Sequence, residues 1–332
     1  MAELVSLDEI RAAARRLAGV TVRTPLVPVP PAAPVNLLIK PESLQPTGAF
    51  KLRGAYNAIA IVMETGDGAP PAGVVAHSSG NHGFAVAYAA RALGVKAAVV
   101  VPHNAPRVKT DAIEAAGAEL VRVEPTLDAR LGGMTRIAEE RGYAQIPPFD
   151  DRRVIAGQGT IGLEIAEDFA GRDVKPAAVL VPVSGGGLIA GIAAAITELL
   201  PETRVIGVEP ELAADARESL HTGRRVRWQS TDVTRTKADA LRVEQIGELP
   251  FAHIRAQVSD IVTVTEKEIL DTVRKVALQA RLIAEPGGAV AVAAALNRTQ
   301  EDLGVPKGGP EPLVAILSGG NVDPALLATV LD

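Results

Sequence analysis

The chain has 332 residues, of which 47% are hydrophobic and 22% charged, so we expect a well-buried protein of two domains. Its net charge of −5 without a basic tract excludes a typical nucleic-acid-binding protein, and no apolar run is long enough to span a membrane. The absence of cysteine excludes disulfides and thiolate chemistry and, together with an acidic N-terminus that lacks an apolar signal core, predicts a cytoplasmic location.

Strands and helices are predicted to alternate along the chain. Ser6 with Glu9 three residues later is a capping-box pattern, which predicts a helix start. Short apolar runs predict strands, and Ala-rich or amphipathic runs closed by glycine predict helices. Strands are predicted at 36–40, 73–77, 95–101, 119–123, 177–183, 205–208, 261–264 and 313–317, and helices at 50–61, 85–93, 107–116, 127–141 and 188–200. This alternation predicts an α/β fold with a parallel sheet and helices on its faces.

Lys51 has an unusual position for a lysine. A turn-forming Pro46-Thr47-Gly48 runs into the helix predicted at 50–61, so Lys51 falls at or near the first turn. There the positive end of the helix dipole opposes the ammonium charge and favours the neutral amine. A neutral amine is what imine formation requires, although a solvated surface lysine is the simpler interpretation of Lys51 alone.

Three polar turns follow predicted strands, at 78–82, 184–187 and 318–321. Backbone N–H groups in Ser-Gly-Gly-Gly at 184–187 can converge on a phosphate, but a tight strand–helix turn uses the same residues. The turn at 78–82 suits a carboxylate or a phenolic oxygen, and an ordinary capped turn has the same composition. In a parallel sheet such turns gather at one edge. Together with a helix-terminal lysine they predict a phosphorylated cofactor that forms an imine, which pyridoxal phosphate fits.

The chain resembles the serine/threonine dehydratase and serine racemase family of pyridoxal-phosphate enzymes, which have the tryptophan-synthase-β-like fold (fold type II). The resemblance runs from about Ile10 to Val330. It rests on KPESLQPTGAFK at 40–51, SSGNHG at 78–83, VIAGQGT at 154–160, and the segments 184–191, 205–210 and 318–321. It implies two domains, each an open, mostly parallel sheet with helices on both faces, and pyridoxal phosphate in the cleft between them. The implied large domain is 1–72 with 149–332, and the small domain is 73–148.

The resemblance also implies roles for individual residues. Lys51 would form the imine with the cofactor and take the α-proton. Phe50 would pack on the pyridine ring, Asn81 would bond its phenolic oxygen, and Ser318 would face its nitrogen. The phosphate would be held by the N–H groups of Ser184, Gly185, Gly186 and Gly187. The substrate carboxylate would be surrounded by Ser78, Ser79, Asn81 and His82, with Arg130 as a further carboxylate partner and Glu285 near the ring.

The implied activity is β-elimination from a β-hydroxy L-amino acid, L-threonine or L-serine first, giving a 2-oxo acid and ammonia. Ser79 stands where a hydroxyl acts on the opposite face of the α-carbon in racemases of this family. Amino-acid racemisation therefore stays an alternative, and so does a simple helix cap by Ser79.

Two further alternatives stay open. Ala240 replaces a usual glycine in a segment that borders the implied pocket, and Arg242 with Arg130 could accept a second carboxylate, as in 3-hydroxyaspartate. Alternatively, Arg242 is a surface arginine. A ligand-sensing protein without chemistry is the non-enzymatic alternative, against which Lys51, Asn81 and Ser318 argue.

A cation site is predicted after the strand at 205–208. Glu209, the carbonyl of Ala213 and Asp215 are hard oxygen ligands of the kind that Mg²⁺ or Ca²⁺ binds. Paired acids in a loop are usually solvated, but the same spacing occurs in metal-dependent members of the family that the chain resembles. The family also suggests a homodimer that acts on a small amino acid.

Overall fold

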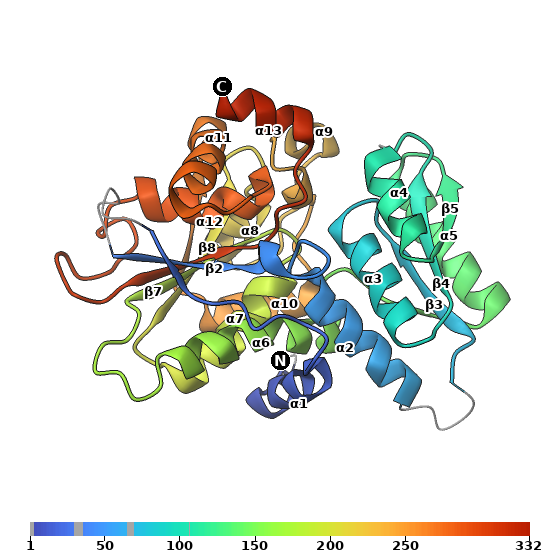
Figure 1. The fold of residues 1–332 in the computed structure, drawn as a ribbon, viewed down its shortest axis with the longest axis horizontal. Helices are drawn as coiled ribbons and strands as arrows, with labels where there is room; N and C mark the ends of the chain where they lie inside the picture. The colour runs from blue at the N-terminus through green and yellow to red at the C-terminus, as the bar shows by residue number, and fades with distance from the viewer. Residues whose placement is uncertain (1–2, 30–35, 65–69, 106) are drawn as a thin grey trace.

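The computed structural model describes residues 3–29, 36–64, 70–105 and 107–332, and two sheets organise it (Figure 1). The larger sheet has the strand order β1-β2-β10-β7-β8-β9, and the smaller one β5-β4-β3-β6. Neighbouring strands in both sheets are parallel, apart from the antiparallel pair β1 and β2. The predicted α/β fold with two parallel-sheet domains is confirmed.

The bounds of the elements are as follows. The larger sheet contains β1 (Val27–Pro28), β2 (Leu37–Pro41), β7 (Ala178–Pro182), β8 (Arg204–Pro210), β9 (Asp260–Val264) and β10 (Leu313–Leu317), and the smaller sheet contains β3 (Gly73–His77), β4 (Ala97–Pro102), β5 (Glu119–Val123) and β6 (Tyr143–Gln145). The α-helices are α1 (Leu7–Leu17), α2 (Lys51–Glu64), α3 (Asn81–Ala92), α4 (Arg107–Ala115), α5 (Leu127–Arg141), α6 (Arg152–Asp168), α7 (Gly187–Leu199), α8 (Asp215–Thr222), α9 (Ser230–Val233), α10 (Glu248–Gln257), α11 (Glu266–Lys275), α12 (Pro286–Asn297) and α13 (Pro324–Leu331).

The central strands of the larger sheet are apolar on both faces. Every residue of β7 and β10 is buried, as expected for parallel strands that are covered on both sides. Leu180 and Ala315 join one apolar core with α12, whereas Val181 and Ile316 join another with α6 and α7. The apolar helices α7 and α12 have only 13 and 12 residues, and no helix in the described ranges is long and apolar enough to cross a membrane.

Helix α2 lies between the two sheets and packs against both parts of the molecule (Figure 1). Its Leu52 and Ile59 share an apolar core with Val74 of the smaller sheet. Its other side packs closely against Gly157 of α6. A Cβ atom added to Gly157 would lie only 2.5 Å from the backbone oxygen of Arg53, so the two helices leave no room for a side chain there. Both faces of α2 are thus fixed by packing, and Lys51 is its first residue.

Three buried charged residues and the half-buried Glu164 reinforce this packing. Arg53 is 1% exposed, and its guanidinium donates to Glu42 Oε2 at 2.8 Å and to Glu164 Oε1 at 2.6 Å. Lys40 is fully buried and donates to Glu164 Oε2 at 2.6 Å. Burial alone would raise the pKa of Glu42, but the charge and hydrogen bond of Arg53, the charge of Lys40 and the hydrogen bond of Thr24 together hold that pKa below its ordinary value. Two cations and two anions cancel here, as buried charges require.

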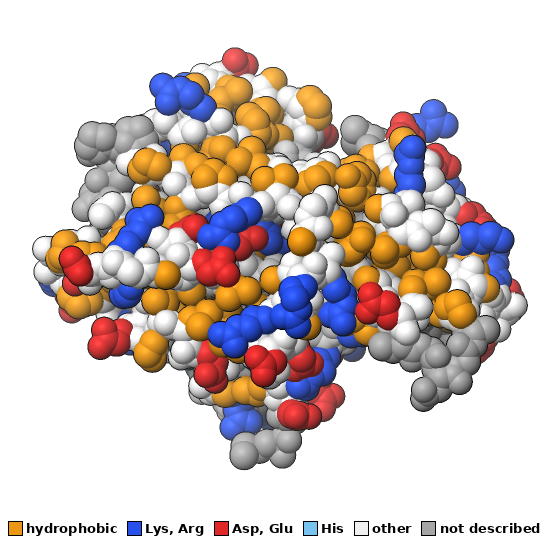
Figure 2. Space-filling view, turned by 60° about the horizontal axis from the view of Figure 1, so that its bottom comes forward, with side chains coloured by type: hydrophobic (Ala, Val, Ile, Leu, Met, Phe, Trp, Pro, Cys, Tyr) orange, Lys and Arg blue, Asp and Glu red, His pale blue; other side chains and the backbone are white. Residues whose placement is uncertain are grey.

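Charges on the surface are also mixed in sign. On the face shown in Figure 2, Lys and Arg side chains lie beside Asp and Glu side chains. Exposed pairs in the chain include Arg23 with Glu167 and Arg141 with Glu119. Such pairs contribute little to stability, in contrast to the cluster around Arg53.

We expect Arg53→Met to lower the free energy of unfolding by about 3–5 kcal/mol, because it leaves the buried carboxylate of Glu42 without its main partner. Urea unfolding followed by circular dichroism measures the change. Lys267→Met is the matched control, since that lysine is 84% exposed in its pair with Asp271 and should leave the midpoint unchanged. Equal effects of the two substitutions would contradict the structural role given to Arg53.

Candidate active site

The amine of Lys51 is buried and makes uncharged contacts. Its Nζ donates to the carbonyl of Pro148 at 2.9 Å and lies 5.0 Å from the centroid of the Phe50 ring. Burial lowers the pKa of Lys51 to about 8. An amine that loses its proton this readily is suited to nucleophilic or base chemistry.

The loop after β10 lies directly beside this lysine. The Phe50 N–H donates to the carbonyl of Ser318 at 3.0 Å, and Ala49 pairs with Gly319 in an isolated bridge. Ser318 is buried. The structure therefore brings Phe50, Lys51 and Ser318 together at the carboxyl end of β10, three residues that the resemblance placed around one ring.

Asn81 connects the smaller sheet to two loops of the larger part. It is the first residue of α3, and its Nδ2 donates to Glu285 Oε1 at 2.6 Å. Its Oδ1 accepts from Asn321 Nδ2 at 2.8 Å. Glu285 is the N-cap residue of α12, and Asn321 belongs to the loop that contains Ser318. Two of the three predicted turns are thus in contact.

The turn at 78–82 is not a side-chain-capped helix start. Gly80 is the N-cap residue of α3 and makes no side-chain cap, and the Ser78 hydroxyl accepts from the Gly80 N–H at 3.2 Å. Capping by Ser79, one of the interpretations left open by the sequence, is therefore not supported. Ser79 is half-buried within the turn.

His82 is neutral. It is 3% exposed, and burial together with the charge of Lys51 lowers its pKa to about 3. Its Nε2 lies 2.9 Å from the carbonyl of Ile146, which only accepts, so Nε2 bears the hydrogen. Its Nδ1 is buried with no hydrogen-bond partner in the described part of the chain. The ring therefore offers one acceptor and no charge.

The glycine turn between β7 and α7 is packed so tightly that side chains would not fit at Gly185 and Gly186. Gly186 has φ +88°, and a Cβ atom there would lie 2.7 Å from Pro250 Cβ. A Cβ atom on Gly185 would collide with the ring of Phe149. The first N–H groups of α7 lack intrahelical acceptors, so the turn suits an anion. Phe149 directly follows Pro148, whose carbonyl holds Lys51, so this one segment touches both the lysine and the turn.

Arg130 and His77 lie on the smaller sheet's side of the site. Burial lowers the pKa of Arg130, and the charge of Glu244 opposes that shift. Burial and the charge of Arg130 lower the pKa of His77 to about 4. His77 Nδ1 is buried without a partner among the described residues. No role was predicted for His77 from the sequence, although its position as the last residue of a strand before a polar turn was a usable signal.

Arg242 is directed elsewhere. It is exposed, and its Nε and second guanidinium nitrogen donate to the carbonyl of Thr236 at 3.0 and 2.6 Å. Of the two interpretations left open for Arg242, the structure favours a surface arginine.

Glu209 and Asp215 form a separate acidic pair at the end of β8. Glu209 accepts from the N–H groups of Ala216 and Arg217, and Asp215 Oδ2 accepts from the Ile246 N–H at 2.7 Å. Burial raises the pKa of Asp215 to about 7, and burial with the charge of Asp215 raises that of Glu209. Two buried carboxylates and the carbonyl of Ala213 fit a hard divalent cation. No group of three His, Cys, Asp or Glu suited to a metal occurs in the described ranges, so backbone or water oxygens would complete such a site.

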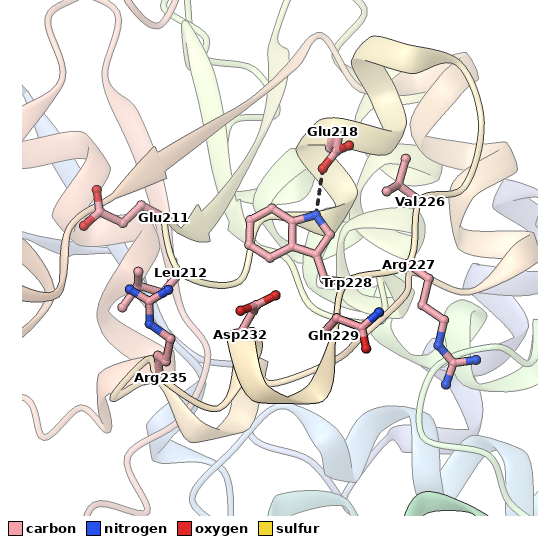
Figure 3. A pocket seen from close by; sticks show the side chains of 9 residues that line it. All are labelled: Glu211, Leu212, Glu218, Val226, Arg227, Trp228, Gln229, Asp232 and Arg235. Atoms are coloured by element: carbon pink, nitrogen blue, oxygen red, sulfur yellow. Dashed lines mark hydrogen bonds between the residues drawn. The ribbon is translucent and has the colours of Figure 1, made fainter.

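A surface pocket of about 430 Å³ is lined in part by residues that flank this pair in the sequence (Figure 3). Its lining consists of Glu211, Leu212, Glu218, Val226, Arg227, Trp228, Gln229, Asp232 and Arg235. The indole Nε1 of Trp228 donates to Glu218 Oε2 at 2.7 Å. Glu211 and Leu212 directly precede Ala213, so the pocket lies next to the proposed cation ligands rather than at Lys51.

Comparison with known proteins gives consistent results. The model of the family described as "Pyridoxal-phosphate dependent enzyme" matches residues 17–319. The chain is 38% identical to an L-threonine ammonia-lyase of Thermotoga maritima, over 99% of this chain and 79% of that protein. It is 37% identical to an L-threo-3-hydroxyaspartate ammonia-lyase of Saccharomyces cerevisiae, over 90% and 86% respectively. The crystal structure of a serine racemase from Dictyostelium discoideum matches with a TM-score of 0.86 at 37% identity, covering 96% of this chain and 99% of that one.

We expect the rate of reductive methylation of Lys51 to increase with pH, with a midpoint near pH 8, because only the neutral amine reacts. An unperturbed lysine has its midpoint near pH 10.4. Because folding lowers this pKa, the free energy of unfolding should also increase with pH between about 8 and 10.5. Mass spectrometry of the peptide that contains Lys51 measures the rate in protein free of carbonyl ligands. An ordinary lysine midpoint would contradict the burial argument.

Proposed function

Because this chain belongs to the family of pyridoxal-phosphate dependent enzymes, we propose that it is an ammonia-lyase for a β-hydroxy L-amino acid, L-threonine or L-serine first. The reaction removes water across the α- and β-carbons, and water then replaces the amine, so that a 2-oxo acid and ammonia are formed. The observation that carries this proposal is the buried amine of Lys51, with a pKa of about 8, beside Phe50 and Ser318.

The residues present fit the cofactor. The buried amine of Lys51 suits an aldehyde, and the start of α7 with Ser184, Gly185, Gly186 and Gly187 suits a phosphate. Phe50 supplies a ring face, while Asn81 and Ser318 supply polar groups nearby. When bound, pyridoxal phosphate stabilises the negative charge that develops on the substrate α-carbon.

Lys51 is the proposed base. Because burial favours its neutral form, Lys51 Nζ can accept the α-proton near neutral pH. The hydroxyl of Ser318 is neutral, so it would not fix a proton on a ring nitrogen as a carboxylate would. Glu285 holds the amide of Asn81 at 2.6 Å and thereby orients it.

The start of α3 is the proposed carboxylate site. The hydroxyls of Ser78 and Ser79 and the N–H groups of Asn81 and His82 belong to one strand-to-helix turn, where the helix dipole favours an anion. His82 would contribute through its backbone, since its ring is neutral and its Nε2 hydrogen is engaged by Ile146. Arg130 is proposed as the partner of a further carboxylate.

Amino-acid racemisation is the second candidate function. A relative with a solved structure is a serine racemase, and the half-buried Ser79 does not cap α3. Incubation with L-serine separates the two activities, because a racemase forms D-serine and a lyase forms pyruvate. A substrate with a second carboxylate is a further alternative, supported by Arg130 and by the hydroxyaspartate ammonia-lyase relative. Release of 2-oxo acid from L-threonine, L-serine and L-threo-3-hydroxyaspartate compares these substrates.

We also propose Mg²⁺ or Ca²⁺ at Glu209, Ala213 and Asp215, a cytoplasmic location, and the domain division 1–72 with 149–332 and 73–148. A homodimer is proposed as well. The exposed apolar side chains of Leu44, Leu278 and Ile283 support an association surface. The backbone oxygen of Ile283 and the Cβ atom of Ser43, which directly precedes Leu44, lie close to Gly320, so Leu44 and Ile283 are near the loop that contains Ser318.

We expect Lys51→Ala to remove the visible-edge absorbance of added pyridoxal phosphate and to slow 2-oxo acid release by roughly a thousandfold, the contribution of a positioned base. Lys267→Ala, at an exposed lysine, is the control and should keep both signals. Retention of both signals in Lys51→Ala would remove the basis of the proposal.

We expect Ser79→Ala to lower D-serine formation by roughly a hundredfold if Ser79 acts on the second face of the α-carbon, while pyruvate formation falls far less. Chiral chromatography and a pyruvate assay on the same samples measure the ratio. Ser78→Ala is the neighbouring control, since its hydroxyl accepts from the Gly80 N–H. An unchanged ratio in Ser79→Ala would contradict the racemase role of this hydroxyl.

A further inference from the structure

We propose that Asp215 is a positioning residue for the phosphate loop, defined as residues 184–187, and that a divalent cation held by Asp215 strengthens phosphate binding by this loop. The inference rests on the proposed function and on the cation site proposed with it. It goes further, because the connection runs through backbone at Ile246 and Gly247 that belongs to neither site.

The first link joins Asp215 to Ile246. Asp215 is 1% exposed, and its Oδ2 accepts from the Ile246 N–H at 2.7 Å. A carboxylate has about four lone-pair sites, so one Asp215 side chain can accept this hydrogen bond and bind a cation together. Its position then decides where the backbone at Ile246 lies.

The second link joins this backbone to the phosphate loop. The Gly247 N–H donates to the Gly185 carbonyl at 3.1 Å. Ile246 also packs against Gly186, where a Cβ atom would lie 3.0 Å from Ile246 Cδ1. The segment 246–247 therefore supports two of the four loop residues, one by a hydrogen bond and one by contact.

The far end of the same segment is fixed as well. Asp150 Oδ2 accepts from the Glu248 N–H at 2.8 Å, and its Oδ1 accepts from the Leu249 N–H at 3.0 Å. Residues 246–249 are thus held by Asp215 at one end and Asp150 at the other. Movement of Asp215 is therefore transmitted to the phosphate loop rather than absorbed in a free chain.

A bound cation would change the electrostatic interaction between Asp215 and Glu209. Glu209 and Asp215 are both buried, and their negative charges oppose each other. A divalent cation held by these two residues and the Ala213 carbonyl would replace this repulsion by attraction and would hold the Asp215 carboxylate in place. A loop that is already ordered loses less conformational entropy when it binds phosphate. Since such coupling is reciprocal, bound phosphate must raise cation affinity by the same factor.

Trp228 is an internal reporter for the cation. It is the chain's only tryptophan, and its Nε1 donates to Glu218 Oε2 at 2.7 Å (Figure 3). The charge of Glu218 acts on Asp215. Cation binding should therefore change the fluorescence of Trp228, a signal that does not depend on catalysis.

The test uses the full chain and measures pyridoxal phosphate affinity by absorbance, with and without Mg²⁺. We expect Mg²⁺ to lower the Kd of pyridoxal phosphate about fivefold or more, and bound pyridoxal phosphate to lower the Mg²⁺ Kd by the same factor. Pyridoxal without its phosphate should show no such factor. A Trp228 response to Mg²⁺ without any change in pyridoxal phosphate affinity, or an equal factor for pyridoxal, overturns the proposal. Binding of pyridoxal phosphate with no response to Mg²⁺ overturns it too, whereas failure to bind pyridoxal phosphate contradicts the proposed function as well.

Variants distinguish the effect of the hydrogen bond between Asp215 and the Ile246 N–H from the effect of the cation. Asp215→Ala should abolish the Mg²⁺ effect and weaken cation-free pyridoxal phosphate binding about fivefold, because the Ile246 N–H loses its acceptor. Glu209→Gln should abolish only the Mg²⁺ effect, since Glu209 bonds to Ala216 and Arg217 instead. If Asp215→Ala does not fold, Asp215→Asn, which keeps an acceptor oxygen without the charge, should behave as Glu209→Gln. Asp232→Asn in the adjacent pocket is the control for lost surface charge. Equal cation-free affinities of Asp215→Ala and Glu209→Gln would overturn the positioning role.

Discussion

The cluster of paired charges formed by the buried Arg53, Lys40 and Glu42 with the half-buried Glu164 is the constraint on which the rest of the site depends. Charges without water must be paired in defined directions, and the planar guanidinium of Arg53 accepts few orientations of its two carboxylate partners. The cluster therefore fixes both the rotation and the height of α2 against β2 and α6. Because Lys51 is two residues before Arg53 in α2, the cluster also holds the backbone of Lys51 in a fixed position. The contacts of the Lys51 amine are themselves uncharged, so no ion pair opposes the loss of its proton.

The turns that follow β3 and β10 lie near this lysine, each at the edge where the parallel strands of its sheet end. Strands β3 and β10 belong to different sheets, yet the turns that follow them meet through Asn81 and Asn321. The electrostatics agree with the geometry, because burial makes Lys51 easier to deprotonate and keeps His82 neutral. The proposed anionic ligand would thus meet backbone N–H groups and an amine that loses its proton more readily than an ordinary lysine.

Local signals predicted much of the fold and the main lysine. The strands at 119–123 and 313–317 and the helix at 127–141 agree with the structure, because apolar runs and closing glycines are local features. Lys51 falls at the first residue of α2, as its turn predicted. Strand β6 was missed because three half-buried residues have no pattern. The contacts of Pro148 and Ile246 were missed for another reason, since they use backbone atoms that any residue possesses. The roles assigned to side chains by resemblance await their experiments.

Helix α2 has a consequence for the modularity of the molecule. Its Leu52 and Ile59 complete the apolar core over Val74 of the smaller sheet, while Arg53 is anchored in the larger part. The smaller sheet is therefore not a self-sufficient folding unit that recombination could exchange intact, because the segment 73–148 lacks part of its own core. A substitution in α2 must therefore be compatible with the packing of both the smaller sheet and the larger part.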